Sequence, residues 1–134
     1  MRGAEPFRWP VRVAYVDTDR GGVVHHGAYL RYLEQARVEL LRARGVDYRA
    51  LEEEHGHALP VAEAFVKYRR PLTFDDRLEV EIWVGICNRA KVRFDSRVWR
   101  GGELTTEARI TCACVRLDTH RIVSVHPLLR SALA

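Results

Sequence analysis

The chain lacks any long apolar run. No stretch approaches the ~18 consecutive apolar residues that a transmembrane helix needs. The first residues include Arg2, Glu5 and Arg8, and they contain no apolar segment of the kind that a signal peptide carries. We therefore expect no transmembrane segment and no export, which makes a cytoplasmic location the default expectation.

Cysteine is scarce, with three residues at Cys87, Cys112 and Cys114. A single residue separates Cys112 from Cys114, one short of the CxxC spacing that zinc and redox sites use. On a strand, residues two apart share a face, so both are predicted to be small, buried apolar side chains. The cysteines thus indicate no metal site and agree with a cytoplasmic location.

A concentrated block of one charge is also missing. The 22 basic and 18 acidic residues leave a net charge of +4, and the arginines are spread through most of the chain. Proteins that bind single-stranded nucleic acid interleave basic and aromatic residues, a pattern that is absent here. A nucleic-acid partner is therefore not expected, whereas a small phosphate-bearing partner suits the positive charge.

One segment carries the period of an amphipathic helix. Its apolar residues recur at steps of four, three and four: Tyr29, Leu33, Ala36 and Leu40. The pattern predicts a helix from Ala28 to about Arg44, with Gly45 as its C-terminal stop. No Ser, Thr, Asp or Asn occupies the capping positions around His26 and Gly27. We therefore expect some of the first N–H groups to be left for a ligand.

Other segments alternate apolar and polar side chains, which is the period of half-buried antiparallel strands. The predicted strands lie at about residues 7–15, 61–68, 77–84, 92–99, 103–117 and 121–125, and residues 47–55 are expected to be helical or irregular. With 134 residues and no repeat or linker, the chain is predicted to form one domain over residues 1–134. The fold class is α+β, with one antiparallel sheet of five or six strands around one long helix.

Two tryptophans lie on the faces opposite the main apolar rows of their strands. Trp83 and Trp99 alternate with the residues that are predicted to face the helix. One face of the sheet and its edges would otherwise stay uncovered. We therefore expect a homo-oligomer, either a dimer or a dimer of dimers.

The segment that precedes the helix concentrates reactive groups. Between Asp17 and Gly27 the chain places two acids, a Gly21-Gly22 pair and two adjacent imidazoles, His25 and His26. Such a segment can present a carboxylate and free backbone N–H groups to a single carbonyl. The glycine pair permits backbone conformations that aim the carboxylate at the helix start.

The same segment belongs to a wider set of residues that together carry a family resemblance. These are Phe7 to Val13, Asp17-Thr18-Asp19, Gly21 to Val24, His26, Tyr29-Leu30 and Glu34 to Arg37, with a weaker match through Tyr68 to Pro71 and the later strands. In these residues the chain resembles the hotdog-fold acyl-CoA thioesterases of the 4-hydroxybenzoyl-CoA thioesterase type. It is most similar to the YbgC-like bacterial subgroup that is associated with the Tol-Pal envelope system. The resemblance covers nearly the whole chain.

The resemblance implies a hotdog fold, acyl-CoA hydrolysis and specific site residues. Asp19 matches the catalytic carboxylate of the family, and His26 matches a position at the start of its central helix. At His25 the closest subgroup commonly has a tyrosine, so the role of this second histidine is left open. Asp17 has a competing role as a turn-forming residue, which we favour for it over catalysis.

Thioester hydrolysis needs an activated water or a nucleophile, and a group that stabilises the oxyanion. Asp19 is the candidate general base on water, or the nucleophile that forms a mixed anhydride; the sequence leaves both routes open. Backbone N–H groups around His26 and Gly27 are the candidate oxyanion site, where the helix dipole also favours negative charge. No cofactor is expected beyond the coenzyme A of the substrate.

Further residues are candidates for the pocket. The His26 imidazole is expected to orient water, to bond Asp19 or to shape the pocket, and Tyr29 and Glu34 are candidate pocket groups, although Tyr29 equally suits the core. The candidate ligands for the coenzyme A phosphates are Arg69, Arg70, Arg89 and Lys91. Each of these four is also compatible with an ordinary surface charge. The other histidines, His55, His57, His120 and His126, are expected to be solvated loop residues.

Three other readings of the sequence remain. Metal-dependent catalysis would use Asp17, Asp19, His25 and His26, but these residues lack a recognised ligand spacing and adjacent side chains seldom converge on one ion. A non-catalytic module that binds acyl-CoA or an acyl carrier protein is the main alternative function. The fold also hosts acyl dehydratases, and fold alone does not identify the reaction. The acyl group, aromatic or aliphatic, is not determined by the sequence.

Overall fold

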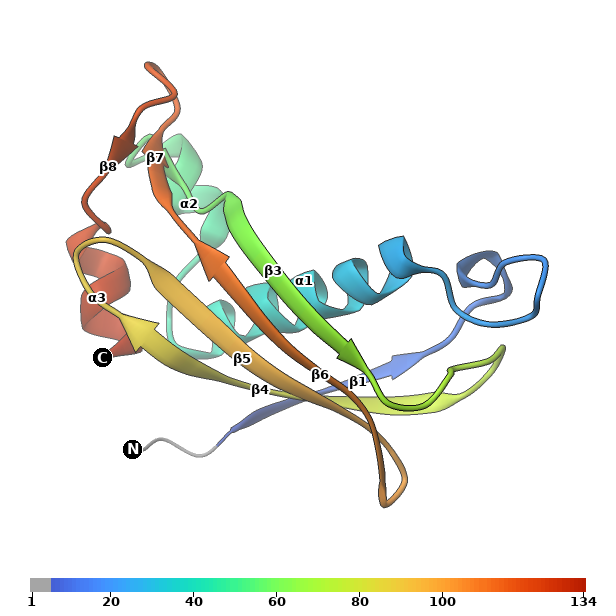
Figure 1. Cartoon of the computed structure of the whole chain (residues 1–134). Coiled ribbons are helices and arrows are strands. Elements are labelled where there is room, and N and C mark those ends of the chain that lie inside the picture. The colour runs from blue at the N-terminus through green and yellow to red at the C-terminus, as the bar shows by residue number, and fades with distance from the viewer. Residues whose placement is uncertain (1–5) are drawn as a thin grey trace.

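The computed structural model describes residues 6–134 of the chain. Arg2 and Glu5, which entered the expectation about export, lie outside these residues. A long helix, α1 (His26–Ala43), lies across one face of a curved sheet. Figure 1 shows the sheet bending around α1, with the loops on either side of the helix start gathered at one end of the molecule. Within residues 6–134, no helix combines the length and apolar character that crossing a membrane requires.

The main sheet has five antiparallel strands in the order β1-β4-β5-β6-β3. Their bounds are Phe7–Arg12 (β1), Val61–Tyr68 (β3), Arg77–Cys87 (β4), Val92–Arg100 (β5) and Glu103–Cys112 (β6). Strand β1 and strand β3 form the two edges. This architecture is the α+β hotdog arrangement that the sequence predicted.

The alternation of apolar and polar side chains along the strands explains which face of the sheet packs against the helix. On β5, Val92, Phe94 and Val98 are fully buried, and they face Leu33 and other apolar residues of α1 across one continuous core. Burying each such side chain contributes on the order of 1.5–3 kcal/mol. The intervening residues of β5 point to the opposite, convex face of the sheet.

The long strand predicted at residues 103–117 is two strands in two sheets. Strand β6 ends at Cys112, and after Ala113 the chain continues as β7 (Cys114–Arg116) in a three-stranded sheet, between β2 (His57–Ala58) and β8 (Ile122–Val123). The break lies opposite Pro60: the Ala113 N–H donates to the Pro60 carbonyl at 3.1 Å, but Pro60 has no N–H with which to continue the ladder. Cys112 and Cys114 are both buried, as predicted.

Residues 47–55 contain a short helix, α2 (Tyr48–Glu53), capped by the Asp47 side chain, which is one of the two predicted alternatives. Two other features differ from the prediction. The first strand ends at Arg12 rather than Tyr15, because a 3₁₀ turn, η1 (Tyr15–Asp17), follows it. A C-terminal helix, α3 (Pro127–Leu133), was not predicted, although a proline in the first turn is a helix-start signal.

The cap of α3 belongs to a cluster of three imidazoles. The Nδ1 atom of His126 accepts a hydrogen bond from the Leu128 N–H at 3.1 Å, and this fixes the start of α3. The His126 ring lies 4.9 Å from the ring of His55 and 4.8 Å from that of His57, between ring centres. His55 is an exposed turn residue, as expected, whereas His57 lies on β2 and His126 caps α3, and both are half-buried. The expectation of a solvated loop residue is therefore wrong for His57 and His126.

This cluster predicts acid sensitivity of the C-terminal helix. Burial, followed by the charges of His57 and His55, lowers the pKa of His126 below its usual 6.5. The unfolded chain takes up this proton at a higher pH than the folded chain does. The contribution of the site to stability is therefore intact above pH 6.5 and is lost as the pH falls from there through the lowered pKa.

Urea unfolding of the wild type and of His126→Asn on both sides of this range measures the effect. Asparagine keeps an oxygen acceptor at the cap but does not titrate. The wild type should lose more of its unfolding free energy on acidification than the variant does. An equal loss in both proteins would contradict the assignment.

Candidate active site

Asp19 lies at the tip of a tight hairpin that precedes α1. The Asp19 N–H donates to the Val23 carbonyl at 2.9 Å, and the Gly22 N–H donates back to the Asp19 carbonyl at 3.0 Å. Gly22 has a φ of 83°, a conformation that favours glycine. The Asp19 carboxylate is exposed, and its Oδ1 accepts a hydrogen bond from the Gly21 N–H at 2.8 Å. No donor from residues 6–134 bonds the other carboxylate oxygen, which is therefore available to a ligand.

Backbone hydrogen bonds fix this hairpin on both sides. The Val24 N–H donates to the Leu72 carbonyl at 2.8 Å, and Val23 forms an isolated bridge with Thr73 in the loop between β3 and β4. On the other side, the His25 N–H donates to the Asp17 carbonyl at 3.0 Å. The hairpin that carries Asp19 is therefore held between two loops and leads directly into α1.

Asp17 is the buried anchor of this region. Its side chain is 1% exposed, and its Oδ2 accepts hydrogen bonds from the Tyr32 hydroxyl at 2.6 Å and from the Ala14 N–H at 3.0 Å. Arg31 donates to the other oxygen. Burial acts to raise the pKa of Asp17, but the hydrogen bonds from Tyr32, Arg31 and Ala14 outweigh it and lower that pKa. Asp17 is thus the turn-forming residue that the sequence predicted.

The start of α1 has a cap that the sequence did not reveal. The helix begins at His26, two residues before the predicted start, and His25 is its N-cap. The Nδ1 atom of His25 accepts a hydrogen bond from the Ala28 N–H at 3.3 Å. A histidine therefore does what Ser, Thr, Asp or Asn usually does, and the prediction of a helix start without a cap was wrong.

The cap still leaves donors at the helix start. Among residues 6–134, no protein acceptor lies within hydrogen-bond distance of the N–H groups of His26 and Gly27. These two donors lie at the positive end of an 18-residue helix, where the dipole favours a negative charge. The helix start and the hairpin carrying Asp19 occupy the same end of the molecule (Figure 1).

Two tyrosines and His26 form one wall of a small cavity next to the helix start. The His26 Nδ1 lies 2.9 Å from the Tyr68 hydroxyl, and the Tyr68 ring makes an edge contact with the ring of Tyr29 at 4.9 Å between centres. The cavity has a volume of about 270 Å³. Its lining residues are Val23, Val24, His26, Tyr29, Tyr68, Arg69, Arg70 and Pro71.

Comparison with known proteins agrees with this architecture. The model of the thioesterase-like superfamily matches residues 13–133. The chain belongs to the thioesterase-like superfamily. It is 36% identical over 126 residues to "Acyl-CoA thioesterase YbgC" of Haemophilus influenzae, which covers 94% of this chain and 93% of that protein. It is 38% identical to "Acyl-CoA thioester hydrolase YbgC" of Escherichia coli O157:H7 over 81% of each chain.

Solved structures show the same fold. A hypothetical protein from Aquifex aeolicus superposes with a TM-score of 0.89 at 30% identity, covering 96% of this chain and all of that one. A hypothetical protein from Thermus thermophilus gives a TM-score of 0.87 at 32% identity, covering 94% and 95% of the two chains. The family that the sequence resembled is therefore confirmed.

Several of the candidate site residues gather at this end of the family fold. Asp19, His26 and Gly27 lie on the hairpin and the helix start, and Tyr29 lines the cavity while it also packs in the core. Arg69 and Arg70 line the same cavity from the end of β3. Arg69 is paired with Glu107 at 2.5 Å, and Arg70 lies 3.4 Å from Glu103.

The remaining candidates lie elsewhere in the protomer. Glu34 is exposed on α1 and lines a different hollow, beside Trp9 and Tyr32. Arg89 and Lys91 belong to the hairpin between β4 and β5, at the opposite end of the sheet from the helix start (Figure 1). Within one protomer, these three residues are not brought together with Asp19.

The structure adds Tyr68 to the site. The sequence analysis did not select it, because its contact with His26 joins residues 42 positions apart. A signal was present, since Tyr68 ends a predicted strand immediately before Arg69. The four residues of the metal alternative have separate partners instead of a shared centre: Asp17 bonds Tyr32, Asp19 bonds Gly21, His25 bonds Ala28 and His26 bonds Tyr68.

The cap predicts a stability difference between two substitutions at position 25. His25→Ala removes the acceptor for the Ala28 N–H and should lower the unfolding free energy by about 0.5–2 kcal/mol. His25→Asn supplies a preferred capping side chain and should keep most of that stability. Urea unfolding of both variants measures the difference, and equal stability of the two would show that His25 is not the cap.

Proposed function

We propose that this protein hydrolyses the thioester of an acyl-CoA to the free acid and coenzyme A. The observation that carries the proposal is that the hairpin with the exposed carboxylate of Asp19 leads into a helix start where the N–H groups of His26 and Gly27 have no hydrogen-bond partner among residues 6–134. Relatives that match most of the chain are named acyl-CoA thioesterases, which supports the same reaction. The three free cysteines suit the proposed cytoplasmic setting.

In the proposed reaction, the carbonyl oxygen of the thioester accepts hydrogen bonds from the His26 and Gly27 N–H groups. Negative charge grows on this oxygen as the carbonyl carbon becomes tetrahedral, and both donors and the helix dipole stabilise it there. Asp19 either takes a proton from the attacking water or attacks the carbon itself. Collapse of the tetrahedral species breaks the carbon–sulfur bond and releases the thiolate of coenzyme A, which needs no strong general acid. In the second route this leaves a mixed anhydride between Asp19 and the acyl group, which water then hydrolyses to the free acid and the Asp19 carboxylate.

The volume of the cavity indicates that one protomer is not the whole site. Ligand pockets usually measure about 300–1,000 Å³, and acyl-CoA is a large ligand. The cavity lined by His26, Tyr29 and Tyr68 measures about 270 Å³, and Tyr68 is the last residue of the edge strand β3. We therefore propose that a second copy of the chain completes the site from that edge.

Strand β3 has the properties of an edge that another copy covers. Seven of its eight residues are exposed, and these include Val61, Phe65 and Tyr68. A long exposed edge with apolar side chains is a site for strand pairing with another chain. The proposed assembly is a two-fold dimer in which β3 pairs antiparallel with β3 of the second copy, and such dimers can pair again.

This pairing would bring two of the three remaining candidate residues, Arg89 and Lys91, to the site. Within the sheet, Val61 lies beside Cys112 and Cys112 beside Val92, so the hairpin with Arg89 and Lys91 lies at the Val61 end. In an antiparallel pair, this end of one copy lies next to the Tyr68 end of the other. Arg89 and Lys91 of the second copy would then approach the acyl-CoA bound beside Asp19, where they can bind its phosphates.

The first test of the reaction is Asp19→Asn. The amide can act neither as a base nor as a nucleophile, so turnover of acyl-CoA should fall by orders of magnitude. Asp75→Asn is the matched control, since Asp75 is an exposed acid at the same end and its φ of 70° suits asparagine. His26→Ala should lose less activity, because the backbone donors survive.

A screen of short, long and aromatic acyl-CoAs on wild type and Asp19→Asn gives the measurement. Near-normal turnover in Asp19→Asn would refute the role of this carboxylate. If no acyl-CoA in the screen is hydrolysed by the wild type, the non-catalytic binding module becomes the better description.

The second test concerns the edge strand. Phe65 on β3 and Phe74 in the loop after it are 52% and 55% exposed, so they form a matched pair. Phe65→Lys should weaken the dimer because it places a charge on the pairing edge, whereas Phe74→Lys should leave it intact. Sedimentation at micromolar concentration measures this, and a monomeric wild type would contradict the proposed assembly.

A further inference from the structure

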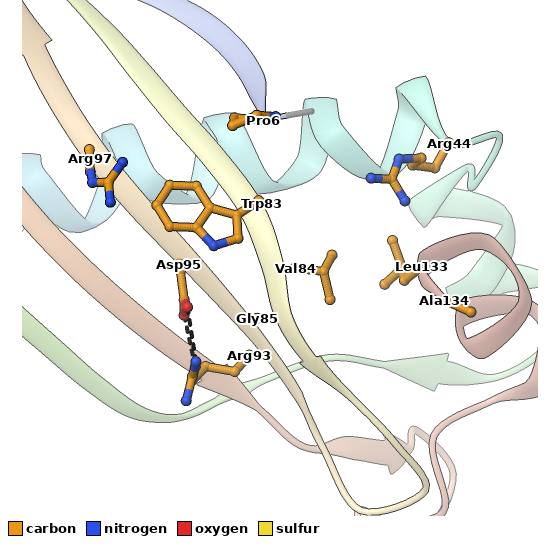
Figure 2. A pocket seen from close by; sticks show the side chains of 10 residues that line it. All are labelled: Pro6, Arg44, Trp83, Val84, Gly85, Arg93, Asp95, Arg97, Leu133 and Ala134. Atoms are coloured by element: carbon orange, nitrogen blue, oxygen red, sulfur yellow. Dashed lines mark hydrogen bonds and ion pairs between the residues drawn. The ribbon is translucent and has the colours of Figure 1, made fainter. Parts of the chain in front are cut away.

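A cavity of about 700 Å³ lies beside β4 and β5, between the side chains of their convex face and the C-terminal ends of α1 and α3. Its lining residues are Pro6, Arg44, Trp83, Val84, Gly85, Arg93, Asp95, Arg97, Leu133 and Ala134. Figure 2 shows Trp83 and Arg97 on one side, Arg44 and the end of α3 on the other, and the Arg93–Asp95 pair between the strands. None of these residues belongs to the site proposed for acyl-CoA.

The floor of this cavity depends on a glycine. The pairing of β4 with β5 is irregular between Val84 and Ile86, and Gly85 occupies the irregularity. A Cβ atom at position 85 would come within 2.4 Å of Asp95 Oδ2 and 2.7 Å of an Arg93 nitrogen. The absence of a side chain is therefore what lets the Arg93–Asp95 pair, with two bonds of 2.8 and 2.9 Å, lie across the strand.

The side chains around the cavity supply many donors and few free acceptors. Within the part of the chain that the structure describes, the Arg44 side chain makes one hydrogen bond, from Nη1 to the Ala132 carbonyl at 3.2 Å, and its other nitrogens have no partner there. The indole N–H of Trp83 has no acceptor among residues 6–134. The lining side chains include three guanidinium groups but one carboxylate, that of Asp95, which is already bonded twice.

The aromatic and apolar surfaces of the cavity define the rest of a ligand. The Arg97 guanidinium lies 5.1 Å from the centre of the Trp83 ring and 3.6 Å from Glu81, so it stacks on the indole while its ion pair stays loose. Val84 adds apolar surface on the side toward Arg44, where Leu133 is almost fully buried. Planar rings stack on such indole–guanidinium surfaces, as nucleic-acid bases do on aromatic side chains.

We propose that this cavity binds a nucleotide, with its base against Trp83 and Arg97 and its phosphates toward Arg44. The excess of donors over free acceptors selects an anion with several acceptor oxygens, which phosphate groups provide. The cavity volume lies within the range of pockets that hold ligands of this size. The site is separate from Asp19 and does not depend on the hydrolysis reaction.

Calorimetric titration of the full chain with ADP tests the proposal, and adenosine and inorganic phosphate serve as partial ligands. ADP should bind saturably, and each partial ligand should bind at least about tenfold more weakly, since each lacks one of the two contacts. Absence of saturable ADP binding at millimolar concentration would overturn the proposal. Equal binding of inorganic phosphate and ADP would also overturn it, because the base would then contribute nothing.

Substitutions locate the bound nucleotide. Arg44→Gln and Trp83→Leu should each weaken ADP binding by about tenfold or more. Arg42→Gln removes the same charge from the same turn of α1 but does not line the cavity, so it should change binding by less than about twofold.

Two results would show that the cavity is not a separate nucleotide site. The first is unchanged ADP binding in both Arg44→Gln and Trp83→Leu while Arg89→Gln abolishes it, which would place ADP in the acyl-CoA site. The second is a tenfold rise in KM for acyl-CoA in Arg44→Gln. Unchanged KM together with weakened ADP binding in this variant supports the proposal.

Discussion

The buried carboxylate of Asp17 is the interaction on which the geometry of the candidate site depends. It bonds the Tyr32 hydroxyl and the guanidinium of Arg31, both on α1, and its backbone carbonyl accepts the His25 N–H. One residue thus connects the end of β1, the hairpin and the helix start. Because the charge is buried and fully bonded, removing any partner would leave an uncompensated group, which is strongly destabilising.

This anchoring separates two acids that lie only two residues apart. Asp17 is buried and fully bonded, so its carboxylate has no capacity left for chemistry. Asp19 is exposed and bonded through one oxygen to its own hairpin. The rigidly held Asp17 fixes the hairpin. Asp19 can then face a ligand without a large loss of conformational entropy on binding.

The periodic patterns of the sequence were sufficient to predict the fold and part of the candidate site. The apolar stripe of Tyr29, Leu33 and Ala36 predicted α1, and the alternation in β4 and β5 predicted the sheet, because burial on one face repeats with the period of each element. The hairpin glycines and the placement of Asp19 before the helix also followed from local pattern. Helix α3 was not predicted, because its seven residues make only about two turns, too few to show an apolar repeat.

The features that escaped prediction are contacts between residues far apart in the chain. Predicting the cap by His25 would have required the orientation of its ring. The contact of His26 with Tyr68 joins residues 42 positions apart, and the role of Gly85 depends on side chains of the neighbouring strand β5. No local signal encodes these distances. The same reasoning applies to Arg89 and Lys91, whose separation from Asp19 in one protomer follows from sheet register. If two copies build the site together, as we propose, a single sequence shows this only as candidate residues that one protomer leaves apart.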